Sequence, residues 1–266
     1  MSSGIVTLAG GGHLAYETRG DGPPLLLCRW MVGAMPLWHR FADALAQTHR
    51  VIAFDPRGTG ASSDGPLRAT TRDMAGDARA LLDALAIDRA DVFGESLGGM
   101  TASWLAIDAP TRVRRLVLSS TLPEPTTISS RAITHALGYA RCFVGPIRDA
   151  VPRVVRKMSA PEFRATHPAR MAAIEAALRR APSTHRNLVA MALAALRHRA
   201  AHRLADVHAP TLLLFGADDP LVGSAARDEL IAERPSATVV VLAEAGHALT
   251  LERPDEIAAR VRDFLS

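Results

Sequence analysis

The sequence predicts an α/β fold built on a mostly parallel β-sheet with helices on both faces. Short apolar runs, typical of strands buried on both faces, alternate with longer segments whose apolar residues recur every three to four positions, as in amphipathic helices. Such alternation favours parallel strands joined by helical crossovers. Eight strands are expected, at residues 5–7, 13–19, 25–28, 51–54, 90–93, 113–118, 211–215 and 237–242.

Length and composition are compatible with one α/β domain carrying a modest insertion, since the chain has 266 residues of which 48% are hydrophobic. The start of the chain lacks a basic segment followed by an apolar one, and no run approaches the roughly 18 apolar residues of a membrane span. We therefore expect a soluble, cytoplasmic protein. The only cysteines, Cys28 and Cys142, are too few for a disulfide framework and are expected to be small buried hydrophobes.

The first strands and helices follow from the pattern in order. The expected strands at 5–7 and 13–19 flank Gly10-Gly11-Gly12 and predict a β-hairpin. The apolar run at 51–54 predicts a buried strand that ends at the turn Asp55-Pro-Arg-Gly-Thr-Gly60. Amphipathic helices are expected at 36–48 and 71–85, and a further helix at 98–108 ends before Pro110.

The pattern changes after residue 120. Residues 121–205 contain no convincing strand and are rich in alanine, arginine and proline, with helical stretches near 128–144, 147–158, 168–180 and 184–202. Alternation of strands and helices resumes at 206. The simplest arrangement is an all-helical lid (121–205) inserted between the sixth and seventh strands of a core formed by residues 1–120 and 206–266.

A nucleophile is indicated where the fifth expected strand ends, at Gly94-Glu95-Ser96-Leu97-Gly98. Glycines two positions before and after Ser96 allow a sharp turn that exposes its Oγ, as in the nucleophile elbow. The motif alone is weak, because chance alone would produce it roughly 0.07 times in a chain of this length and composition. An ordinary helix N-cap is the alternative for Ser96.

The loops after the last two strands contain partners for such a serine. Asp218 and Asp219 follow the strand at 211–215, and His247 follows the strand at 237–242. The chain order Ser, Asp, His is the one expected of this architecture. His247 would act as general base and an aspartate would orient its ring. Turn formation before Pro220 for the aspartates, and a structural role for His247, remain alternatives.

Five motifs together resemble the α/β-hydrolase superfamily, over essentially the whole chain outside the lid. They are the apolar strand and loop at 25–38, Asp55-x-Arg-Gly-x-Gly-x-Ser62, Gly94-x-Ser-x-Gly98, Gly216-Ala-Asp-Asp219 and Gly246-His247. The elbow Gly-Glu-Ser-Leu-Gly-Gly-Met is similar to that of enol-lactone hydrolases and small carboxylesterases with a helical lid. The resemblance implies a serine hydrolase that cleaves a carboxylic ester or lactone through an acyl-enzyme, without a cofactor, with Asp219 rather than Asp218 as the acid.

The loop after the third strand departs from the family, whose members usually have His-Gly where this chain has Arg29-Trp30. If the loop keeps its path, the oxyanion-hole donors are the N–H groups of Met31 and Leu97. Arg29 is a candidate to bind a substrate carboxylate, with pairing to Glu95 or Asp55 as the structural alternative. Trp30 is a candidate to stack on a planar substrate, or simply a pocket wall. Asp55 and Arg57 are expected to be structural, with contacts that fix loops and do not touch substrate.

Charge leaves the class of substrate open. Residues 125–209 contain 14 basic and four acidic residues, a surplus that would steer an anionic or carrier-bound small-molecule substrate or simply form a solvated face. No nucleic-acid-binding motif and no metal-ligand spacing is present. Two further functions stay open: non-hydrolytic chemistry by the same triad, such as elimination, acyl transfer or ring chemistry, and ligand binding without catalysis. A monomer and a homo-oligomer are both compatible with the sequence.

Overall fold

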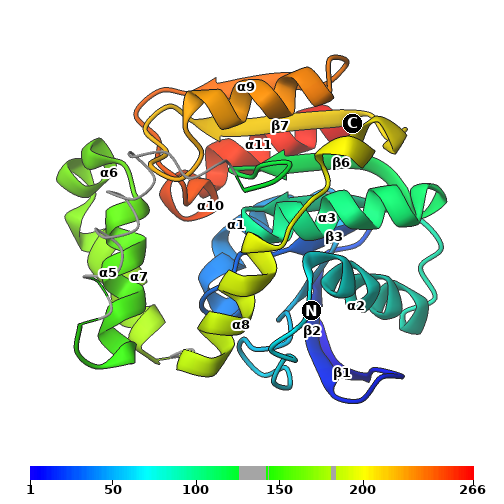
Figure 1. Ribbon diagram of the computed structural model, residues 1–266, viewed down its shortest axis with the longest axis horizontal. Helices are drawn as coiled ribbons and strands as arrows, with labels where there is room; N and C mark the ends of the chain where they lie inside the picture. Colours follow the sequence, from blue (N-terminus) through cyan, green and yellow to red (C-terminus); the bar gives the residue numbers. More distant parts are fainter. Residues whose placement is uncertain (126–141, 143, 181–183) are drawn as a thin grey trace.

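The computed structural model describes residues 1–125, 142, 144–180 and 184–266, and its centre is one eight-stranded sheet (Figure 1). The strand order is β1-β2-β4-β3-β5-β6-β7-β8. The pairs β1–β2 and β2–β4 are antiparallel, and every other pair is parallel. The strands are β1 (Ser2–Thr7), β2 (His13–Arg19), β3 (Pro24–Cys28), β4 (Arg50–Phe54), β5 (Ala90–Glu95), β6 (Val113–Ser119), β7 (Thr211–Gly216) and β8 (Thr238–Leu242). The predicted eight-stranded, mostly parallel sheet is confirmed.

Helices cover both faces of the sheet, and alternate side chains of each strand pack on opposite faces. Leu25 and Leu27 of β3 pack with α1 (His39–Leu45) and α11 (Pro254–Leu265). Leu26 and Cys28 pack on the other face. There they meet residues of α2 (Thr71–Ala84), α3 (Leu97–Asp108) and α9 (Ser224–Glu233). The period of two along a parallel strand therefore supplies two separate cores.

Strand β5 lies between β3 and β6, and all six of its residues are buried. Phe93 of this strand is fully buried and packs its ring against Trp38 and Phe41, with centroids 5.9 and 4.9 Å away. Because β5 ends in the serine turn, this aromatic cluster anchors the base of the predicted nucleophile.

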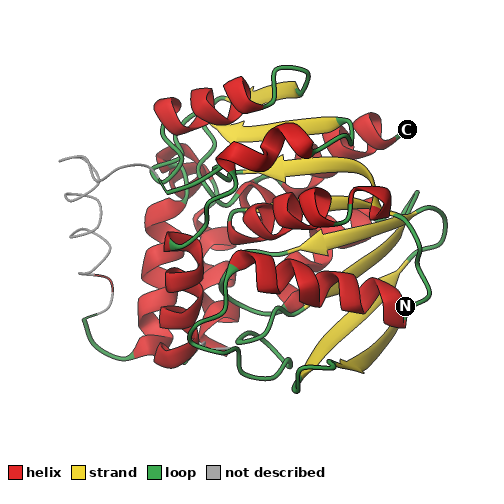
Figure 2. Ribbon diagram, turned by 45° about the vertical axis from the view of Figure 1, so that its right-hand side comes forward, coloured by secondary structure: helices red, strands yellow, loops and turns green. Residues whose placement is uncertain are grey.

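The described part of the segment between β6 and β7 contains no strand, and its regular elements are helices. They are α5 (Ile147–Met158), α6 (Pro161–Thr166), α7 (Pro168–Arg180), α8 (His185–Leu196) and the 3-10 helix η4 (Ala201–Asp206). Helices α5 to α8 lie beside the end of the sheet to which the arrows of the parallel strands point (Figure 2), whereas η4 contacts α3 and α9. None of the helices in the described part of the chain is long and apolar enough to cross a membrane.

Two of the four predicted helices of this insertion, 147–158 and 168–180, have the predicted bounds. The helix α6 was not predicted, because it has only six residues and begins at Pro161 directly after Ala160, whose ψ of 142° is not helical. The helix expected at 184–202 ends at Leu196. The stretch near 128–144 lies outside the described residues, except for positions 142 and 144.

Replacing Phe93 by alanine is expected to lower the free energy of unfolding by about 3–5 kcal/mol, because the cavity it leaves is walled by a rigid sheet and two aromatic rings. Urea unfolding followed by circular dichroism measures this. Ile5, 66% exposed on the edge strand β1, is the control, and Ile5→Ala is expected to change stability by no more than about 0.5 kcal/mol. Equal losses in the two variants would contradict the assignment of β5 to the core.

Candidate active site

Ser96 stands on a strained turn between β5 and α3, with φ 57° and ψ −120°. Its neighbours hold this conformation: the Ser96 N–H donates to the Ser119 carbonyl at 2.8 Å, and the Thr121 hydroxyl donates to the Ser96 carbonyl at 2.8 Å. The flanking glycines are required because a side chain would not fit at either position. A Cβ on Gly94 would lie 2.4 Å from the Gly98 carbonyl oxygen, and one on Gly98 would lie 2.0 Å from that of Cys28. Strain held in place by surrounding structure is typical of functional sites.

Three side chains from distant parts of the sequence meet at this turn. Ser96 Oγ lies 2.8 Å from His247 Nε2, and His247 Nδ1 lies 2.8 Å from Asp219 Oδ2. The other oxygen of Asp219 accepts the N–H groups of Leu221 and Val222 at 2.8 and 2.9 Å, which fixes the carboxylate. The neighbouring Asp218 is exposed instead. The structure thus brings together Ser96, His247 and Asp219, and Asp218 is not in contact with the histidine ring.

The environment of His247 makes its ring a stronger base than an ordinary histidine. Burial by itself would lower the pKa of His247. The charge and hydrogen bond of Asp219, together with the charges of Glu95 and Glu252, outweigh burial and raise that pKa. Because the ring is 2% exposed, the charged form depends on these carboxylates rather than on water.

Leu97 and Met31, the predicted oxyanion-hole residues, belong to the same apolar cluster. Leu97 is the first residue of α3, so its N–H belongs to the helix turn that lacks partners within the helix. Its side chain packs with Met100 and with Met191 of α8, and Met31 packs against the same group. This apolar cluster joins the loop after β3, the start of α3 and the insertion.

Arg29 does not face this site, and its predicted role in binding a substrate carboxylate is contradicted. Its side chain is fully buried; Nη2 forms an ion pair with Asp55 and Nε donates to the Phe54 carbonyl at 3.1 Å. The structural alternative, pairing with Asp55, is the observed one, whereas Glu95 bonds to Thr250. A charged arginine in the core is strongly destabilising unless a buried acid compensates its charge, and Asp55 is that acid.

Trp30 is also a core residue. It is 1% exposed and belongs to the cluster that includes residues of α1 and α11. Such burial leaves no ring face free to stack on a planar substrate in this conformation, so the predicted stacking role is corrected as well.

The Asp55 carboxylate holds the loop that contains Met31. Besides Arg29, its Oδ1 accepts the N–H of Met35 at 3.1 Å, and its Oδ2 accepts the N–H of Ala61 at 3.0 Å. Arg29 and Met35 lie on either side of Met31 in the chain, so one buried acid fixes both ends of this loop.

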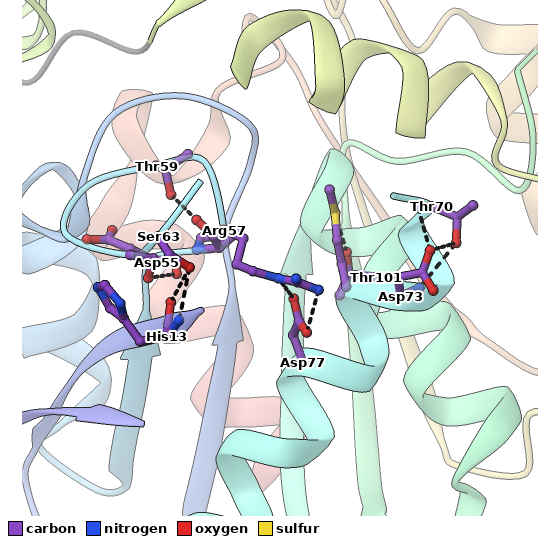
Figure 3. Close-up of polar contacts among 12 residues, drawn as sticks. His13, Asp55, Arg57, Thr59, Ser63, Thr70, Asp73, Asp77 and Thr101 are labelled. Carbon is purple, nitrogen blue, oxygen red and sulfur yellow. Dashed lines mark hydrogen bonds and ion pairs between the residues drawn. The ribbon is translucent and has the colours of Figure 1, made fainter. Parts of the chain in front are cut away.

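Arg57 lies in the same turn and forms a two-point contact with Asp77 of α2, at 2.7 and 2.9 Å (Figure 3). The structural contacts expected of Asp55 and Arg57 are therefore present. Both residues fix loops through buried or half-buried hydrogen bonds.

Two acidic residues near His247 were not predicted as part of the site. Glu95 is fully buried and accepts the N–H and hydroxyl of Thr250 at 3.1 and 2.6 Å; burial raises its pKa to about 7. Glu252 is the last residue of α10 (Leu249–Glu252) and is 3% exposed. The signal available in the sequence was an acidic residue directly after an apolar run: Glu95 one position before Ser96, and Glu252 five positions after His247. Among the described residues, no group of three or more His, Cys, Asp or Glu side chains is arranged to hold a metal ion.

Known proteins resemble this chain in sequence and in fold. A family model described as the alpha/beta hydrolase fold matches residues 23–254. The chain belongs to this family.

Among curated proteins, the chain is 32% identical to "Putative carbamate hydrolase RutD" of Variovorax paradoxus (strain S110) over 260 residues, 95% of this chain and 96% of the relative. Among solved structures, it resembles the enol-lactonase of Burkholderia xenovorans LB400, with a TM-score of 0.84, 24% identity and coverage of 98% and 99%. Est816, described as an N-acyl homoserine lactone degrading enzyme, has a TM-score of 0.82, 26% identity and coverage of 98% and 100%. Together these findings support a hydrolase of the α/β-hydrolase fold.

Replacing Arg29 by methionine is expected to cost about 3–5 kcal/mol of unfolding free energy, because it leaves the Asp55 carboxylate buried without its cation. Denaturant unfolding measures the loss. The matched control is Arg40→Met: Arg40 pairs with Asp255 on the surface, where both side chains are 61% exposed, and about 1 kcal/mol or less is expected there. A loss in R29M as small as in the control would contradict the structural role of the buried pair.

Proposed function

We propose that this protein is a serine hydrolase that cleaves a carboxylic ester or lactone through an acyl-enzyme intermediate. The observation that carries the proposal is the continuous chain of hydrogen-bond distances from Asp219 through His247 to a serine on a strained, glycine-flanked turn. A structural serine or histidine would not require this strain, and a turn aspartate would not require burial against an imidazole ring.

The proposed reaction uses each group at one atom. His247 Nε2 takes the proton of Ser96 Oγ as the oxygen attacks the substrate carbonyl, and the N–H groups of Leu97 and Met31 stabilise the oxyanion. The protonated ring then gives the proton to the alkoxide oxygen of the substrate as the acyl-enzyme forms; the alcohol of an ester departs, whereas that of a lactone stays attached to the acyl group. A water molecule, deprotonated by His247, attacks the acyl-enzyme, and His247 returns the proton to Ser96 Oγ as the acid is released. Asp219 holds the ring tautomer and stabilises the imidazolium throughout.

The helical insertion is proposed to act as a lid over a small-molecule substrate. Met191 of α8 packs against Leu97 and Met100 beside the nucleophile, which supports an apolar group next to the reacting carbonyl. Part of the positive charge of the insertion is used within it, since Arg156 pairs with Glu175 and Arg179 with Asp149. Attraction of an anionic or carrier-bound substrate therefore has weaker support than an apolar acyl group.

Carbamate cleavage is the second candidate, and the carbamate hydrolase name of the Variovorax relative favours it. The same triad would attack the carbonyl of a carbamate ester, expel its alcohol and form a carbamoyl-enzyme, which water hydrolyses to a carbamic acid that loses CO2 to give the amine. The geometry is therefore compatible with both substrates. Non-hydrolytic chemistry was suggested by the unusual Arg29-Trp30 loop. That reason is removed, because both side chains lie in the core.

Replacing Ser96 by alanine is expected to reduce kcat/KM for p-nitrophenyl esters at least about 1000-fold, and Asp219→Asn by about 100- to 10,000-fold, because the first removes the nucleophile and the second the orienting charge. Asp218→Asn is the matched control and should retain the activity of the unmodified protein, since Asp218 is exposed. A fluorophosphonate probe should label Ser96 in the unmodified protein. Absence of labelling together with retained activity in S96A would refute the proposed mechanism, and absence of both labelling and turnover would favour a binding protein.

The choice between substrates is tested by comparing short aliphatic p-nitrophenyl esters, an N-acyl homoserine lactone and an N-alkyl carbamate under the same conditions. The apolar cluster at Leu97 predicts that kcat/KM for the esters rises as the acyl chain lengthens from two to a few carbons, by about tenfold for one or two buried methylenes. Met191→Ser should flatten this dependence. Faster turnover of the carbamate than of every ester or lactone would instead establish the second candidate.

A further inference from the structure

A buried carboxylate beside His247 takes no part in the proposed reaction. Glu252 Oε2 accepts two backbone N–H groups, from Gly246 at 2.9 Å and from Ala160 at 3.2 Å. Gly246 directly precedes His247, whereas Ala160 is the residue before α6 in the insertion. One side chain thus bridges two segments that are far apart in the sequence.

Backbone contacts join the same two segments. The N–H of His247 donates to the carbonyl of Met158, the last residue of α5, at 2.9 Å. A Cβ on Gly246 would lie 2.5 Å from both the Met158 oxygen and the Ala160 nitrogen. The His247 loop therefore contacts the α5–α6 junction (residues 158–160) so closely that only glycine fits at position 246. The junction thereby fixes the main chain at Gly246 and at His247.

Charge couples the bridge to the histidine ring. Burial raises the pKa of Glu252 to about 7, against the opposing effect of the N–H groups of Gly246 and Ala160 and the ring of His247. An ionised carboxylate accepts N–H groups more strongly than a neutral one. Its negative charge also contributes to the raised pKa of His247.

We propose that Glu252 is a positioning residue: by bridging Gly246 and Ala160, it fixes the His247 loop to the α5–α6 junction, so that this part of the insertion supports the catalytic base. The inference rests on the proposed function, in which His247 is that base. This positioning role implies that the insertion does not move as one rigid lid. A substrate enters by movement elsewhere in the insertion, because displacing residues 158–160 would also displace His247.

Two substitutions separate the bridge from its charge. Glu252→Gln keeps an oxygen able to accept both N–H groups and removes the charge. This variant is expected to retain most of its kcat, while the acid limb of the kcat/KM profile moves to lower pH, because His247 loses a nearby negative charge. Glu252→Met has a similar length and removes both. Its kcat is expected to fall about 10- to 100-fold at every pH, with a smaller change in KM, because the base is displaced from Ser96.

The matched control is Glu244→Gln, which removes an exposed carboxylate from the same loop, three residues before His247. Solvent and salt screen that charge, so the pH profile should not move. A kcat in E252Q as low as that in E252M, or a kcat in E252M equal to that of the unmodified protein, would overturn the proposal.

A second variant tests the bridge from its other end. Ala160 has φ −55° and follows a residue with ψ 146°, so the backbone dihedrals at this position allow proline. Ala160→Pro removes the N–H that Glu252 accepts and places Cδ in its direction, so the carboxylate must move away from residue 160. It should lower kcat in the same direction as E252M and leave the acid limb in place. A160P decides the question if E252M does not fold, and unchanged kcat in A160P would then count against the bridge.

Residue-resolved amide hydrogen exchange reads the bridge without relying on turnover. The amides of Gly246 and His247 should exchange faster in E252M and A160P than in E252Q or the unmodified protein. Equal exchange in all four proteins overturns the proposal. Failure of the proposed function has a different signature: the unmodified protein would neither hydrolyse any of the substrates nor react with the fluorophosphonate, whereas the exchange experiment would still report on the bridge.

Discussion

The main chain of Ser96 has a conformation that costs on the order of 1–3 kcal/mol, and much of the surrounding structure exists to hold it. The bend can form only where β5 is fixed between two parallel strands and where α3 approaches the end of β3 closely enough to exclude any side chain at Gly98. The carbonyl of Ser119 and the hydroxyl of Thr121, both at the end of β6, complete the support. The serine is therefore presented by the centre of the sheet, not by a flexible loop.

Buried acids fix the loops that meet at this serine. Asp55 binds both ends of the Met31 loop, Glu95 ties β5 to α10, and Glu252 ties the His247 loop to the insertion. Each carboxylate accepts at least two N–H or O–H groups, which offsets part of the cost of burying it. In this protein, acidic residues other than Asp219 fix the loops around Ser96 and His247.

The insertion contacts the candidate site at two places with different character. At the α5–α6 junction it contacts the histidine loop through backbone hydrogen bonds and a buried carboxylate. Through α8 it contacts the start of α3 by apolar side chains, chiefly Met191 against Leu97 and Met100. Hydrogen bonds between main-chain groups demand a fixed geometry, whereas thioether and leucine contacts can repack at little cost. Of the two contacts, the one made by α8 is therefore the easier to repack.

The sequence by itself determined the eight strands, the helical insertion between the sixth and seventh, and the order of Ser96, Asp219 and His247, because local patterns of hydrophobicity and glycine report directly on buried strands and tight turns. The local pattern left Asp218 and Asp219 both possible as turn residues, and only the family resemblance favoured Asp219. The fold separates them physically, because it buries Asp219 against the His247 ring. For Arg29 and Trp30 the sequence left a substrate-binding and a structural interpretation open, because local sequence does not show whether a residue next to a site points into the site or into the core. The fold buries both side chains and pairs Arg29 with Asp55. Glu252 and Ala160 are 92 positions apart. A contact across that separation is decided by how the insertion packs on the sheet, which no short motif encodes.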